Sequence, residues 1–89
     1  MELRDTVALV TGGSEGIGHA IAEALANEGS RVTITGRRED VVRDVAEELG
    51  LDWIAGDVGS EEHAVRTVSS VIEKHGRLDI LVNNAGYGL

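Results

Sequence analysis

Residues 11–18 read Thr11-Gly-Gly-Ser-Glu-Gly-Ile-Gly18, and this glycine-rich stretch decides the fold. It follows a continuous apolar run at residues 6–11, whose length is typical of a buried strand. After it, the apolar spacing changes to that of a helix, which runs from Ile17 towards Gly29. The stretch therefore predicts a tight turn that carries the chain from a strand into a helix.

The same alternation of short β-branched runs and helical segments continues along the chain. Strands are predicted at residues 31–35, 51–55 and 79–83. One helix is predicted before Gly50 and another between Ser60 and Gly76. The order βαβαβαβ implies parallel strands, because each crossover helix returns the chain to the same edge of the sheet. We predict an α/β fold, a partial doubly wound Rossmann-type parallel sheet, over residues 1–89.

Composition excludes several classes of protein. The formal net charge of −8 argues against a nucleic-acid partner, since such binding depends on basic side chains. There is no cysteine, and His19, His63 and His75 are far apart in sequence, so no metal site is predicted and these histidines are assigned to helix surfaces. The apolar runs are too short to span a membrane, and the composition suits a cytoplasmic protein.

The glycine-rich turn itself predicts an anion site. Gly12 and Gly13 permit backbone angles that are closed to other residues, Gly16 lets the main chain approach a phosphate, and Gly18 lets the helix pack close to the strand. Free backbone amides and the helix dipole then point at one spot. The alternative is a turn without a ligand, but the spacing and context favour a nucleotide.

The motif is T-G-x-x-x-G-x-G rather than G-x-G-x-x-G, because Ile21 stands where the latter needs a third glycine. In this form the chain resembles the short-chain dehydrogenase/reductase family. Further matches are residues 56–58 (Gly-Asp-Val) after the third strand and residues 83–86 (Asn-Asn-Ala-Gly) after the fourth, so the likeness covers all 89 residues. The resemblance implies the strand order 3-2-1-4 and the N-terminal, cofactor-binding part of an oxidoreductase.

By that resemblance, the turn holds a pyrophosphate, residues 57–58 border the adenine, and residues 83–86 brace the central strands and touch the ribose. Residues 57–58 could instead form an ordinary strand-end turn, and residues 83–84 could merely satisfy loop backbone groups. Including the arginines discussed next, the predicted cofactor-binding residues are Thr11, Gly12, Gly13, Ser14, Gly16, Ile17, Gly18, Arg37, Arg38, Asp57, Val58, Asn83, Asn84, Ala85 and Gly86.

The choice of cofactor depends on the end of the second strand, where NAD-binding folds present an acidic side chain to the ribose. Here Gly36 is followed by Arg37 and Arg38, and a guanidinium engages a 2′-phosphate through charge-assisted bonds. We therefore predict NADP rather than NAD. Against this, both arginines could be solvated residues that open the next helix. Glu15 also stands where some NADP-preferring relatives carry a basic residue, although Ser14 offers a hydroxyl.

Carbonyl reduction in the family that the chain resembles relies on a tyrosine, a lysine four residues later and a serine. Tyr87 would need its lysine at position 91, beyond Leu89, and Lys74 would need a tyrosine where Ser70 stands. No catalytic residue is therefore predicted.

The resemblance also implies a missing C-terminal portion. An exposed sheet face and edge are expected to bind that portion or a second copy of the chain. The alternatives are a noncatalytic nucleotide-binding module and a truncated remnant without function.

Overall fold

The computed structural model describes residues 2–57 and 59–84 as a four-stranded sheet with three helices. All strand pairs are parallel, and the order is β3-β2-β1-β4. The fold class, element order and strand order predicted from the sequence are confirmed. The elements are β1 (Val7–Thr11), α1 (Gly16–Asn27), β2 (Arg31–Gly36), α2 (Glu39–Leu49), β3 (Asp52–Ala55), α3 (Glu61–His75) and β4 (Ile80–Asn83).

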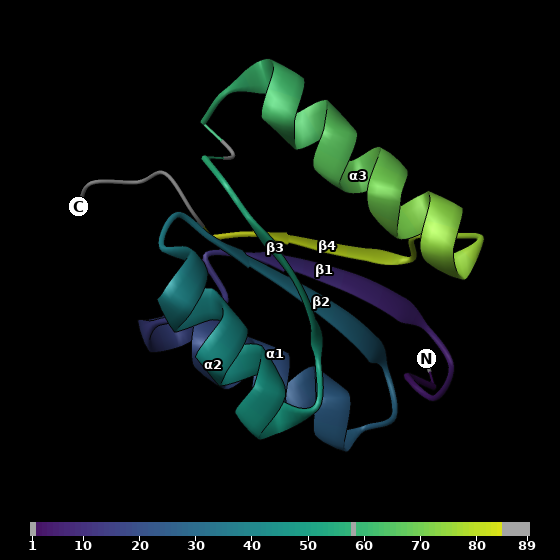
Figure 1. The fold of residues 1–89 in the computed structure, drawn as a ribbon. Coiled ribbons are helices and arrows are strands. Elements are labelled where there is room, and N and C mark those ends of the chain that lie inside the picture. The colour runs from purple at the N-terminus through teal and green to yellow at the C-terminus, as the bar shows by residue number, and fades with distance from the viewer. Residues whose placement is uncertain (1, 58, 85–89) are drawn as a thin grey trace.

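Helices cover both faces of the sheet. α1 and α2 lie on one face, whereas α3 lies alone on the other (Figure 1). Every residue of β1 is buried, which explains why this strand is apolar along nearly its whole length. Beneath α1 and α2 the buried core consists of Ala8, Val10, Ala22, Val32, Ile34, Val42 and Ala46. The core beneath α3 is smaller and contains Val7, Leu9 and Val71.

The ends of α2 and α3 follow the signals in the sequence. The Ser60 hydroxyl accepts a hydrogen bond from the His63 amide at 3.4 Å, so Ser60 caps α3 as predicted. Gly50 and Gly76 adopt the left-handed conformation, with φ of 71° and 82°, directly after the last helical residue. Both predicted glycine stops are confirmed.

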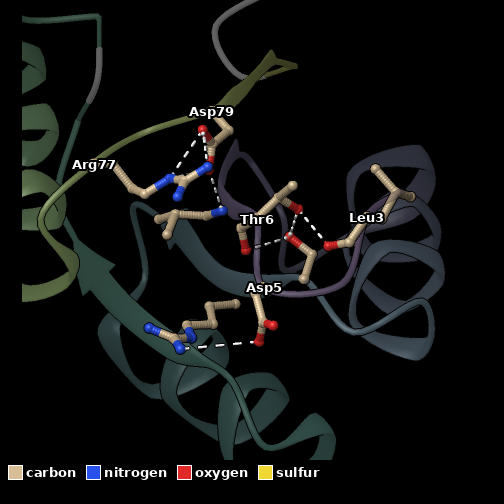
Figure 2. A network of polar contacts seen from close by, with 8 residues as sticks. Leu3, Asp5, Thr6, Arg77 and Asp79 are labelled. Carbon is tan, nitrogen blue, oxygen red and sulfur yellow. Dashed lines mark hydrogen bonds and ion pairs between the residues drawn. The ribbon is translucent and has the colours of Figure 1, made fainter. Parts of the chain in front are cut away.

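The amino end of the sheet is held by polar contacts of Asp79 (Figure 2). Its carboxylate accepts a hydrogen bond from the Val7 amide at 2.8 Å, and its own amide donates to the Val7 carbonyl at 2.9 Å. Hydrogen bonds from Arg77 are the main cause of the lowered pKa of Asp79. β1 begins at Val7 rather than at the expected Thr6, because the Thr6 amide and hydroxyl both donate to the carbonyl of Leu3.

A second polar cluster joins β3 to the C-terminal turn of α3. Asp52 accepts hydrogen bonds from Lys74 Nζ at 2.8 Å and His75 Nε2 at 2.9 Å. The His75 side chain is only 11% exposed, so its assignment to the helix surface is wrong. A cavity of about 350 Å³ lies beside this cluster, between α3 and the amino end of β3. On this half of the sheet the polar contacts of Asp52 thus add to the small apolar cluster that contains Val71 and Ile54.

This cluster makes stability depend on pH. Burial raises the pKa of Asp52, but the hydrogen bonds from Lys74 and His75 outweigh it, and the pKa is lowered. A lowered carboxylate pKa stabilises the fold above the unfolded-state pKa, and this contribution is lost as pH falls through the folded-state pKa. At about pH 7 we expect Asp52→Asn to reduce the free energy of unfolding by about 0.5 kcal/mol, because the pair is partly exposed.

Urea denaturation across a pH series measures this difference. It should shrink as the pH falls below about 4, where the unfolded carboxyl is protonated. Equal stability of the two proteins at about pH 7 would contradict the role of Asp52.

Candidate functional site

The glycine-rich turn joins β1 to α1 at the carboxyl edge of the sheet (Figure 1). Gly12 has a φ of 68°, a conformation that favours glycine. Its amide donates to the Thr35 hydroxyl at 3.2 Å, and the Gly13 amide donates to the Thr35 carbonyl at 3.1 Å. The first two amides of the turn are therefore bonded to β2 and do not point at open space.

The second half of the turn opens outward. A methyl group placed on Gly16 would meet no heavy atom within 4 Å, and Ile17 is 73% exposed. Glu15 occupies the N-cap of α1 but makes no side-chain hydrogen bond to it. Since the first-turn amides of a helix have no intrahelical acceptor, those at this exposed end of α1 are left to bind water or a ligand. This end of α1 has the geometry of an anion site.

The first turns of the three described helices differ in charge. α2 has Glu39 and Asp40 there, and α3 has Glu61 and Glu62 together with its Ser60 cap. α1 has no acidic residue in its first turn and no side-chain cap bond. Acidic side chains near a helix N-terminus satisfy its positive dipole end. Among the described helices, the N-terminus of α1 is the least compensated from within the fold.

Gly18 lies where two segments of the site meet. A methyl group on it would overlap the Gly12 carbonyl and come within 2.6 Å of the Asn84 side-chain amide. That amide donates to the Gly12 carbonyl at 3.4 Å, and the Asn84 backbone amide donates to the Thr11 hydroxyl at 2.9 Å. The Thr11 hydroxyl also lies 3.2 Å from the side-chain oxygen of Asn83. Asn83 and Asn84 thus brace β4 against β1, whereas their contact with a ribose remains a prediction.

The two arginines after β2 differ in their surroundings. Arg38 pairs with Asp40 at 3.8 Å, whereas Arg37 is exposed and takes no part in the ion pairs of the described residues. The Ser14 hydroxyl approaches Gly36 so closely that a methyl group on this glycine would lie 2.9 Å from it. The structure therefore brings Ser14 beside the residue that precedes Arg37.

The end of β3 forms a local turn. The Asp57 carboxylate accepts a hydrogen bond from the Gly59 amide at 2.8 Å, and its carbonyl accepts one from the Ser60 amide at 3.0 Å. The strand-end turn considered as an alternative is thus present, and the contact of Asp57 with an adenine remains a prediction. Val58, Ala85 and Gly86 lie outside the described residues.

Sequence reasoning missed the position of His63. This residue was assigned to the helix surface, yet its ring lies against the backbone of Gly56, where a side chain would overlap it. The available signal was the Ser60 cap, because a residue three positions after an N-cap often folds back on the preceding loop. His63 therefore belongs to the carboxyl edge of the sheet, next to the turn of Asp57.

Residues 2–57 and 59–84 contain neither a cluster of metal-ligating side chains nor a helix that could span a membrane. No three His, Cys, Asp or Glu side chains are grouped so that they could hold a metal ion. No described helix combines the length and apolarity needed to cross a bilayer.

Comparison with known proteins identifies the family. The sequence profile described as short chain dehydrogenase matches residues 6–88. The chain belongs to this family. It is 44% identical to an uncharacterised oxidoreductase of Staphylococcus saprophyticus, covering 97% of the chain and 39% of that protein. It is 46% identical to a putative ketoacyl reductase of granaticin polyketide synthase from Streptomyces violaceoruber, covering 90% of the chain and 33% of that protein.

Solved structures of short-chain dehydrogenases share the fold. The Pseudomonas aeruginosa RhlG/NADP active-site complex superposes with a TM-score of 0.88 at 43% identity, covering 97% of the chain and 36% of RhlG. A metagenomic short-chain oxidoreductase in complex with NADP gives a TM-score of 0.89 at 39% identity, covering 99% of the chain and 42% of that protein. The chain thus spans well under half the length of these relatives.

Two glycine substitutions distinguish the effect of close packing on stability, at Gly18, from the effect of backbone conformation, at Gly16. Gly18→Ala should destabilise the fold by about 2–3 kcal/mol, because its methyl group overlaps the Gly12 carbonyl although alanine favours helices. Gly16→Ala should cost about 1 kcal/mol, since only its φ of 56° is unfavourable. Chemical denaturation measures both changes. A greater loss for Gly16→Ala than for Gly18→Ala would contradict the close approach.

Proposed function

We propose that this chain is the N-terminal part of a dinucleotide-binding domain and binds NADP in an oxidoreductase. The observation that carries this proposal is the weakly compensated N-terminus of α1, which opens beside Gly16 and near an arginine with no ion pair among the described residues. The N-terminus of α1 suits a pyrophosphate, and the arginine suits a 2′-phosphate. The NADP-bound relatives of the same fold support this choice.

Each part of the site is proposed to hold one part of the cofactor. Amides from Ser14 to Gly18 bind the pyrophosphate, while Gly12 and Gly13 shape the turn through their bonds to Thr35. The Arg37 guanidinium and the Ser14 hydroxyl bind the 2′-phosphate, and Arg38 contributes less because it already pairs with Asp40. Residues 57–58 border the adenine, and residues 83–86 touch the ribose.

The reaction of the whole protein is proposed to be hydride transfer to or from a carbonyl or alcohol substrate. The nicotinamide ring supplies the hydride when the cofactor is bound. The proton requires an acid from the protein, and the only lysine of this chain, Lys74, bonds Asp52 at the far end of β3. This position supports the view that the chain lacks the catalytic pair. The same position of Lys74 equally favours a second candidate function, that of a noncatalytic nucleotide-binding module in the cytoplasm.

Titration with NADPH, NADH and 2′-phospho-ADP-ribose tests the cofactor assignment. We expect NADPH and 2′-phospho-ADP-ribose to bind about equally, and NADH to bind more weakly. Arg37→Asp should weaken NADPH binding by roughly 1–3 kcal/mol, because it removes a charged hydrogen-bond donor from the 2′-phosphate. Arg38→Asp is the matched control and should have a smaller effect. An unchanged preference for NADPH in Arg37→Asp would exclude this residue as the selector.

The exposed apolar surface of α3 and β4 is proposed to be covered by the rest of the protein. β4 is an edge strand, and Leu81 in it is 55% exposed. Leu81 pairs with Leu9 and so lies on the face of α3, where Val65 and Ile72 are 59% and 44% exposed. Relatives are more than twice as long as the region they share with this chain. Without further chain, a second copy would cover this surface.

Self-association of the chain on its own tests this second point. Sedimentation velocity should show larger species at higher protein concentration, because an apolar face beside an open strand edge favours association. Leu81→Lys should reduce this association, and Glu47→Lys, an exposed change on α2, should not. A chain that stays monomeric and unfolds in one sharp reversible transition would contradict the proposal.

A further inference from the structure

His63 lies at the junction of α3 with the loop that follows β3. The loop begins at Gly56, whose φ of 150° is available to glycine and rarely to other residues. The His63 ring lies directly against this glycine, in the space that a side chain would need. The His63 ring therefore fills the space that the absence of a side chain on Gly56 leaves free.

Thr67, one turn along α3, fixes the orientation of the ring. The Thr67 hydroxyl donates its proton to the His63 carbonyl at 2.8 Å, and its oxygen lies 3.3 Å from His63 Nε2. Thr67 is only 2% exposed, so its end of this contact is buried. The ring therefore lies between Thr67 and Gly56, with its Cε1 and Nε2 atoms nearest to Gly56.

The loop held in this way links two sides of the candidate site. The Gly56 amide donates to the Gly36 carbonyl at 2.9 Å, which joins the loop to the residue before Arg37. On its other side, Asp57 bonds the amides of Gly59 and Ser60. A shift of Gly56 towards the space of a missing ring would move Asp57 relative to Arg37.

We propose that His63 is a positioning residue that fixes Gly56 and Asp57, at the start of the loop after β3, where they receive the adenine. This inference rests on the proposed function, which assigns the adenine to that loop. His63 acts through Gly56 and does not touch the cofactor. The ring acts by filling the space beside Gly56 with its Cε1 and Nε2 atoms, and the contact with Thr67 orients it.

The test uses 2′,5′-ADP, which carries the adenine, and inorganic pyrophosphate, which does not. Binding of each to the full chain is followed by the amide resonances of Gly16 and Gly59. His63→Ala should weaken 2′,5′-ADP binding about tenfold and leave pyrophosphate binding within about twofold, a tenfold change being about 1.4 kcal/mol. His63→Phe keeps a ring against Gly56 and should restore 2′,5′-ADP binding to within about threefold of the original.

His75→Ala is the matched control, because it also removes a histidine that joins α3 to β3, but at the opposite end of the helix. It should lower thermal stability without changing the affinity for 2′,5′-ADP. If His63→Ala binds 2′,5′-ADP as tightly as the original chain, or if His63→Phe binds it as weakly as His63→Ala, the positioning role is wrong. Failure of the original chain to bind 2′,5′-ADP would instead overturn the proposed function, and this inference with it.

Discussion

The close approach of Gly18 to the carbonyl of Gly12 is the constraint on which the site depends. It brings the first turn of α1 onto the end of β1 and leaves a gap that the Asn84 amide fills by bonding the same carbonyl. Any side chain at position 18 would push the helix outward and separate these groups. With the contact in place, the turn between Gly12 and Gly18 leaves open space beside Gly16, next to the first turn of α1.

Much of the fold could be predicted because its signals are local. The apolar run of β1, the Ser60 cap and the glycines at positions 50 and 76 each act within a few residues of themselves. The capture of the Gly12 and Gly13 amides by Thr35 could not be predicted, because it depends on the register of β1 against β2. The contact of His75 with Asp52 likewise depends on how α3 lies across the sheet, and helical periodicity does not set that orientation.

An acidic chain can offer an anion site because the charges are unevenly distributed. The net charge is −8, yet acidic residues occupy the first turns of α2 and α3 and are absent from the first turn of α1. Fields near a ligand depend on the nearest groups, especially on amides and guanidinium groups within a few ångströms. Glu15 is the nearby exception, and its side chain makes no hydrogen bond to the helix it precedes. Repulsion from the rest of the surface acts over longer distances and is screened by salt.

The glycine-rich turn keeps its shape through the two strands beside β1, and it does not depend on what covers the outer edge of β4. β1 lies between β2 and β4, and each neighbour holds one side of the turn, β2 through Thr35 and β4 through the adjoining Asn84. Both contacts are made by residues in, or directly after, the four described strands. The exposed residues of α3 and β4, by contrast, lie on the other face and at the outer edge. A further polypeptide segment over that surface would stabilise the sheet as a whole. The geometry of the turn is set instead by β2 and β4, the neighbours of β1.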